Sequence, residues 1–234
     1  MNKSMKTVVA ASVLAAVMGS SAAMAGASAN VGATSNYVWR GITQSADGAA
    51  VSGGLDYSHD SGLYVGTWTS STAWSSSEVD LYGGYATTLG GVSLDVGLTR
   101  YAYPTNSLLN WTEVKVAAGF GPAKVTVARG DSVFGYTDVN STYAALDLSH
   151  TLKDDLSVGL HAGYWKFSEA INPSIVTNGF TVGTDEADTM AEYGVSLTKG
   201  EFTFTVSDSN LDKDIYTQDG QYRVYASFTR KFDL

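Results

Sequence analysis

The sequence of 234 residues contains no cysteine, only three prolines and few basic residues. Without cysteine, no disulfide can hold the chain together, so its stability must come from packing or from regular backbone hydrogen bonding. The 14 Lys and Arg residues stand against 23 Asp and Glu residues, which gives a formal net charge of −9. Phosphate binding needs clustered basic residues, and nucleic acid is therefore not an expected partner.

The longest apolar run lies at the N-terminus and has the pattern of a secretion signal. Two lysines precede an apolar stretch at residues 8–18, and an Ala-Met-Ala sequence ending at residue 25 supplies the small residues that a signal peptidase needs. The run is shorter than the roughly 20 residues of a transmembrane helix. We therefore predict a cleaved signal peptide at residues 1–25, export from a bacterial cytoplasm, and a single mature domain at residues 26–234.

After this segment the dominant pattern is the alternation of apolar and polar residues, which indicates β-strands. In residues 92–99, for example, aliphatic side chains alternate with Ser, Asp, Gly and Thr. Many strands have the length of about nine to eleven residues that a tilted strand needs to cross a hydrocarbon layer. Twelve strands are predicted, at residues 30–40, 49–58, 62–70, 78–88, 91–101, 111–120, 123–130, 141–150, 155–166, 189–198, 201–208 and 221–232.

Short and long connections alternate along the chain. Sequences such as SHDSG, TTLGG and LTKGE are turn-like, whereas the connections at 41–48, 71–77, 102–110, 131–140, 168–188 and 209–220 are longer. This is the arrangement of an all-β, antiparallel up-and-down transmembrane β-barrel with short periplasmic turns and long outer loops. Closure leaves no backbone edge unpaired in lipid. A soluble sandwich of two sheets remains the alternative fold.

The barrel interpretation assigns the two faces of each strand. Lumen-facing candidates are Arg40, Asp56, Asp80, Glu113, Lys115, Asp147, His161, Glu192 and Arg223, and candidates for an aromatic belt at the membrane boundary are Tyr37, Trp39, Tyr85, Tyr164 and Tyr222. In the stretch SNYVWRG, Tyr37 and Trp39 are expected to face lipid, and Arg40 to face lumenal acids such as Asp56 or Asp80. These charges would either give a pore a weak cation preference or pair to plug a narrow barrel.

Three motifs carry a resemblance to a known family: SNYVWRG at 35–41, GLYVG at 62–66 and DLYGGY at 80–85. With them the chain resembles the proteobacterial family of unknown function called Gcw_chp, whose members are also labelled TorF-family porins. The resemblance implies an outer-membrane barrel with a pore role, and it carries over no substrate and no catalytic residue. The alternating last strand, with Phe232 and a terminal Leu234, is typical of chains that the barrel-assembly machinery inserts beside lipopolysaccharide.

Two kinds of chemistry are weighed against this reading. His161 could act as a base in a barrel hydrolase, yet no serine motif accompanies it, and a hydrogen-bonded lumen residue is the simpler interpretation. Five residues have the spacing of a calcium-binding loop: Asp208, Asn210, Asp212, Asp214 and Asp219. Lys213 stands where such a loop needs glycine, so a solvated acidic loop is the simpler interpretation. No cofactor is expected.

The apolar residues of loop 168–188 suggest that it either constricts the lumen or covers its mouth. The sequence as a whole predicts a porin that passes small hydrophilic solutes without catalysis. A non-conducting barrel with a structural or surface-interaction role is the alternative.

Overall fold

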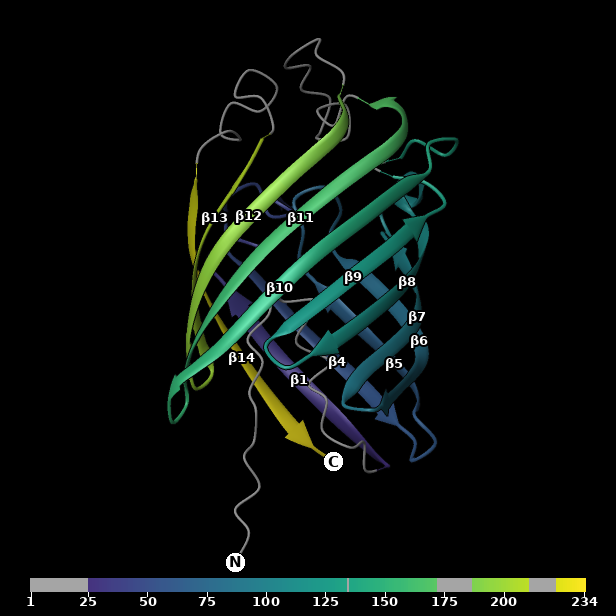
Figure 1. The fold of residues 1–234 in the computed structure, drawn as a ribbon. Coiled ribbons are helices and arrows are strands. Elements are labelled where there is room, and N and C mark those ends of the chain that lie inside the picture. Colours follow the sequence, from purple (N-terminus) through teal and green to yellow (C-terminus); the bar gives the residue numbers. More distant parts are fainter. Residues whose placement is uncertain (1–24, 134, 172–186, 211–221) are drawn as a thin grey trace, which may run out of the picture.

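The computed structural model describes residues 25–133, 135–171, 187–210 and 222–234, which form one closed barrel (Figure 1). Each strand pairs antiparallel with its neighbour, and the first strand pairs with the last to close the sheet. The barrel strands are β1 (Gly26–Thr34), β4 (Ala50–Ser58), β5 (Leu63–Ser70), β6 (Glu78–Leu89), β7 (Val92–Ala102), β8 (Trp111–Phe120), β9 (Ala123–Gly130), β10 (Ser141–Lys153), β11 (Leu156–Ile171), β12 (Ala187–Lys199), β13 (Phe202–Ser209) and β14 (Arg223–Asp233). The predicted up-and-down barrel of twelve strands is confirmed, and the two-layer sandwich is excluded.

Short turns and long connections alternate as predicted, and we call the two ends of the barrel the turn end and the loop end. The turn at Gly90–Gly91 has positive φ at both residues (58° and 84°), as a two-residue hairpin turn with the twist of its strands requires. Both ends of the described chain lie at the turn end, where the backbone N–H of Leu234 donates to the carbonyl of Ala27 at 3.0 Å. The predicted signal peptide lies outside the described residues, except for Ala25.

The outer surface of the barrel is apolar. On β6, Leu81 points outward and is 59% exposed, whereas the preceding Asp80 points inward and is 2% exposed. On β5, whose apolar face the sequence leaves ambiguous, Leu63 and Val65 face outward and Trp68 is buried inside. Such a surface is unfavourable in water and suits hydrocarbon, so the barrel is a transmembrane one. No helix in the described ranges is long and apolar enough to cross a membrane.

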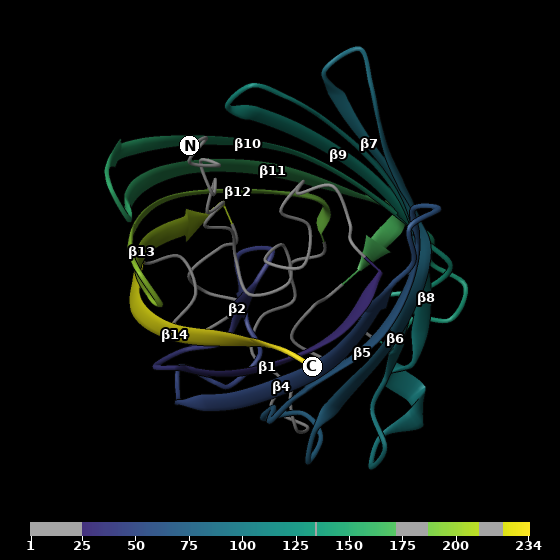
Figure 2. The same ribbon diagram turned by 90° about the horizontal axis from the view of Figure 1, so that it is seen from below.

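The prediction for the first strand, residues 30–40, is wrong. β1 ends at Thr34, and residues 35–49 leave the wall and fold into the lumen, where they form the short strands β2 (Val38–Trp39) and β3 (Ile42–Thr43) (Figure 2). We call residues 35–49 the internal hairpin. Thr34 and Ala50 are register partners in β1 and β4, so the internal hairpin is an insertion between two strands that a short turn could join.

Candidate functional site in the barrel lumen

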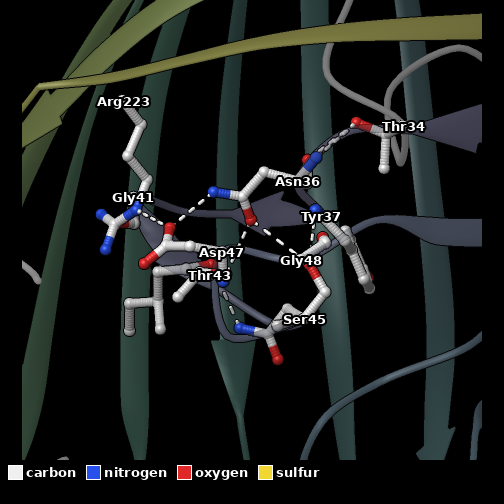
Figure 3. Close-up of polar contacts among 11 residues, drawn as sticks. Thr34, Asn36, Tyr37, Gly41, Thr43, Ser45, Asp47, Gly48 and Arg223 are labelled. Carbon is white, nitrogen blue, oxygen red and sulfur yellow. Dashed lines mark hydrogen bonds and ion pairs between the residues drawn. The ribbon is translucent and has the colours of Figure 1, made fainter.

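The internal hairpin is held by a network of polar contacts (Figure 3). The Asn36 amide donates to Asp47 Oδ1 at 2.6 Å and accepts from the Thr43 hydroxyl at 2.7 Å. Arg223 of β14 donates through Nε to Asp47 Oδ1 at 2.9 Å and through Nη1 to the carbonyl of Gly41 at 3.3 Å. These contacts fix the hairpin to itself and to the last strand of the barrel.

Aromatic packing holds the tip of the hairpin against the opposite wall. The Trp39 ring makes edge contacts with Tyr101, Trp111 and Trp165, at centroid distances of 5.8, 5.7 and 5.1 Å. Tyr101 and Trp111 stack at 4.5 Å, and Trp165 is fully buried. Since these rings come from β7, β8 and β11 while Arg223 comes from β14, the hairpin crosses the lumen.

Tyr37 anchors the start of the hairpin. Its hydroxyl donates to Glu78 Oε1 at 3.0 Å, and Tyr103 donates to Glu78 Oε2 at 2.7 Å. The Tyr37 ring also packs edge-on against Trp68 at 5.6 Å. Burial, followed by the charge of Glu78, raises the pKa of the Tyr37 hydroxyl, so it stays a hydrogen-bond donor.

Arg40 lies at the tip, in a pocket of carboxylate and aromatic groups. Its Nη2 is 2.8 Å from Glu113 Oε1, and its guanidinium carbon lies 3.9 Å from the Tyr143 ring centroid and 5.0 Å from that of Trp165. Within the described part of the chain, three buried atoms here have no hydrogen-bond partner: Arg40 Nη1, Glu113 Oε2 and Asp80 Oδ1.

Nearer the turn end the lumen is lined by charged pairs that water can reach. Lys115 lies 3.1 Å from Asp95, and Lys124 lies 3.5 Å from Asp147. These two lysine side chains are 30% and 27% exposed, against 10% for Arg40. The lumen is therefore hydrated at the turn end and dry where the internal hairpin crosses it.

His161 belongs to this hydrated part. Its Nδ1 lies 2.7 Å from Asp147 and its Nε2 lies 3.1 Å from Glu192 and 3.2 Å from the Tyr143 hydroxyl. Tyr143 itself donates to Glu192 at 2.6 Å. Within the described residues, the partners of the His161 ring are two carboxylates and one tyrosine hydroxyl.

The structure places all nine lumen candidates inside the barrel; their role in lining a pore stays a prediction. The expected partner of Arg40 is wrong, since Glu113 takes the place of Asp56 or Asp80. Asp56 instead accepts from Tyr82 at 2.5 Å.

The belt candidates divide into two groups. Tyr85, Tyr164 and Tyr222 face outward and are 46%, 50% and 70% exposed. The belt assignment is wrong for Tyr37 and Trp39, which lie in the lumen because the wall ends at Thr34 and their rings find aromatic partners inside.

Of the calcium candidates, the Asp208 carboxylate accepts from Tyr193 and the Asn210 side chain accepts from the backbone of Ala191. Asp212, Asp214 and Asp219 lie outside the described residues, as do residues 172–186 of the predicted loop 168–188. Among the residues that are described, no three acidic or histidine side chains are arranged to hold a metal ion.

Several residues of the site are missing from the sequence prediction. They share inward-facing positions near the loop end: Glu78, Tyr101, Tyr103, Trp111, Tyr143 and Trp165. In the sequence, the aromatic members of this set could have been identified because the alternation of their strands places them on the inward face.

These features define a twelve-stranded transmembrane β-barrel whose lumen is crossed by an inserted hairpin. Residues 19–229 match the family described as "Bacterial protein of unknown function (Gcw_chp)", and the chain belongs to this family, as its motifs predicted. No curated protein matches the sequence.

Two solved structures of the KdgM porin share the fold. The KdgM porin aligns with a TM-score of 0.52 and 10% identity, over 88% of this chain and 99% of that one. The KdgM porin in complex with disordered oligogalacturonate aligns with a TM-score of 0.50 and 8% identity, over 89% and 99%. The NanC porin has a TM-score of 0.49 and 9% identity, over 89% and 99%. At these identities the KdgM alignments compare architecture alone.

Proposed function

We propose that the protein is a channel of the bacterial outer membrane that passes small hydrophilic solutes without catalysis, and that the internal hairpin restricts its pore. The observation that carries this proposal is the hydrated, charged lumen at the turn end, which continues up to a hairpin that is not part of the wall. The KdgM porin fold is consistent with it. A cleaved signal peptide, insertion by the barrel-assembly machinery and contact with lipopolysaccharide belong to the same proposal.

The charges of the lumen favour cations over anions. The basic side chains that line it are Arg40, Lys115, Lys124, His161 and Arg223, whereas the acidic ones are Asp47, Asp56, Glu78, Asp80, Asp95, Glu113, Asp147 and Glu192. An excess of one sign along a narrow pore repels ions of that sign. We therefore expect neutral or cationic solutes here, in contrast to the oligogalacturonate of the KdgM complex, which carries many carboxylates.

Recordings across planar lipid bilayers test the proposal. In a shortened variant, Gly-Gly replaces residues 36–48, a turn that the pairing of Thr34 with Ala50 permits. We expect a small conductance from the chain with its hairpin, a several-fold larger conductance from the shortened variant, and preference for K⁺ over Cl⁻ in both. If neither the chain with its hairpin nor the shortened variant conducts current, the channel proposal is rejected.

A permanently closed barrel with a structural role is the second candidate. The full burial of Trp165 and the contacts of Trp39 with β7, β8 and β11 favour it, because they fill the lumen at one level. Silence from the chain with its hairpin at every applied voltage, together with conduction by the shortened variant, would support this closed barrel instead.

A further inference from the structure

Arg40 occupies a backbone position that does not suit arginine. Arg40 and Gly41 form the two-residue turn between β2 and β3, and both have positive φ (47° and 75°). Such turns favour Asn or Gly at the first position, because a left-handed conformation brings Cβ close to the backbone. Arginine is therefore explained by what its side chain binds and not by the turn.

The walls of the Arg40 pocket belong to the barrel itself. Tyr143 of β10 and Trp165 of β11 present their rings to the guanidinium, and Glu113 of β8 supplies the counter-charge. A carboxylate combined with aromatic faces is the chemistry that recognises guanidinium and substituted ammonium groups.

The Arg40 side chain leaves hydrogen-bonding groups of this pocket without a partner. Only one nitrogen–oxygen contact joins Arg40 to Glu113, at 2.8 Å, and Arg40 Nη1 and Glu113 Oε2 are both buried without a hydrogen-bond partner. A free guanidinium, which no turn constrains, could make the paired, two-bond contact with the carboxylate.

The pocket also holds more carboxyl groups than Arg40 can contact. Glu78 and Asp80 lie on the inward face of β6, two strands from Glu113 on β8. Both oxygens of Glu78 accept tyrosine hydroxyls, but Asp80 Oδ1, on a residue 2% exposed, has no partner in the described chain. A buried carboxylate oxygen without a donor is costly, and a cation would relieve that cost.

We propose that the lumen contains a binding site for organic cations bearing a guanidinium or ammonium group, formed by Glu113, Asp80, Tyr143 and Trp165, and that Arg40 occupies it as a tethered substitute. This inference rests on the proposed channel function, because such cations are then solutes that compete with Arg40 on their way through the pore.

The test uses the shortened variant, in which the site faces an open lumen. Guanidinium chloride or arginine methyl ester, added during potassium recordings, should block the current in a concentration-dependent manner, whereas glutamate should not. Glu113→Gln together with Asp80→Asn should weaken the block at least tenfold. Glu201→Gln, in an exposed turn, is the matched control and should leave the block unchanged.

Each outcome separates this inference from the proposed function. Conduction without block, or a block that survives both substitutions at the site, overturns the cation site and leaves the channel standing. If neither the shortened variant nor the chain with its hairpin conducts, the channel proposal fails. Whenever the shortened variant does not conduct, the site is tested in Arg40→Ala with the hairpin retained. A saturable change of tryptophan fluorescence with guanidinium, absent when Glu113→Gln is added, supports the site, and no change overturns it.

Discussion

The ion pair between Arg40 and Glu113 ties the internal hairpin to the wall, and its removal should destabilise the protein measurably. The two side chains are 10% and 5% exposed, and the charged atoms are 2.8 Å apart. Removing one partner of a buried pair costs about 3–5 kcal/mol, because the remaining charge stays buried without a counter-charge. In Arg40→Ala the remaining charge is that of Glu113.

The hairpin itself limits this cost. If it detaches from the wall, water reaches Glu113, so the loss cannot exceed the free energy that docks the hairpin. We therefore expect a loss of about 3 kcal/mol, at the lower end of that range. Glu113→Gln keeps a hydrogen-bond acceptor for Arg40 and should cost less, about 1.5–3 kcal/mol. The double variant should lose less than the sum, with a coupling energy of about 1–3 kcal/mol.

Urea unfolding in lipid vesicles, followed by tryptophan fluorescence and circular dichroism, measures these losses. Arg129→Ala is the matched control, because Arg129 faces outward and its contact with Thr142 is exposed; its effect should stay within about 0.5 kcal/mol. A loss below about 1 kcal/mol for Arg40→Ala, or strict additivity in the double variant, would refute the account of a buried, coupled pair.

Four further substitutions test the turn end, the outer surface and the hairpin network. Gly62→Ala should lower the thermal midpoint, because Gly62 has φ of 95° and an added Cβ would lie 2.2 Å from the carbonyl oxygen of Ala86. Leu81→Arg should cost about 2–4 kcal/mol in lipid, and Leu89→Arg near the turn end about 0–1 kcal/mol, in urea unfolding from vesicles. Asp47→Ala should raise the channel conductance, with an unchanged circular dichroism spectrum, because it releases the hairpin from β14.

Opposite outcomes would locate the error in each case. An unchanged midpoint for Gly62→Ala would mean that the turn rearranges freely. Equal costs for the two leucine substitutions would mean that the outer face at Leu81 is not immersed in hydrocarbon. An unchanged conductance for Asp47→Ala would mean that the aromatic contacts hold the hairpin without the polar network.

Alternation along the sequence predicts the barrel wall well, because one side of every strand meets hydrocarbon and the other does not. β8 and β9 have the predicted bounds, and the later strands lie at the predicted positions, with β10 and β11 extending further than expected. The register of two neighbouring strands depends on short turns such as Gly90–Gly91, which are also readable from the sequence.

The internal hairpin could not be predicted in the same way. Tyr37 and Trp39 continue the alternation of β1, and an aromatic ring is equally suited to a membrane boundary and to a cluster of other rings. Only the position of Trp111 and Trp165, far along the chain, decides between the two environments. The charge pairs of the lumen depend on strand register in the same manner, so Arg40 could be placed inside the barrel but not assigned to Glu113.

The contact between Arg223 and Asp47 makes the attachment of the internal hairpin depend on the last strand. The pairing of β14 with β1 closes the barrel. The same strand supplies the arginine that binds Asp47. Closure of the barrel and attachment of the hairpin thus depend on one strand, and a chain truncated before β14 would lose both at once.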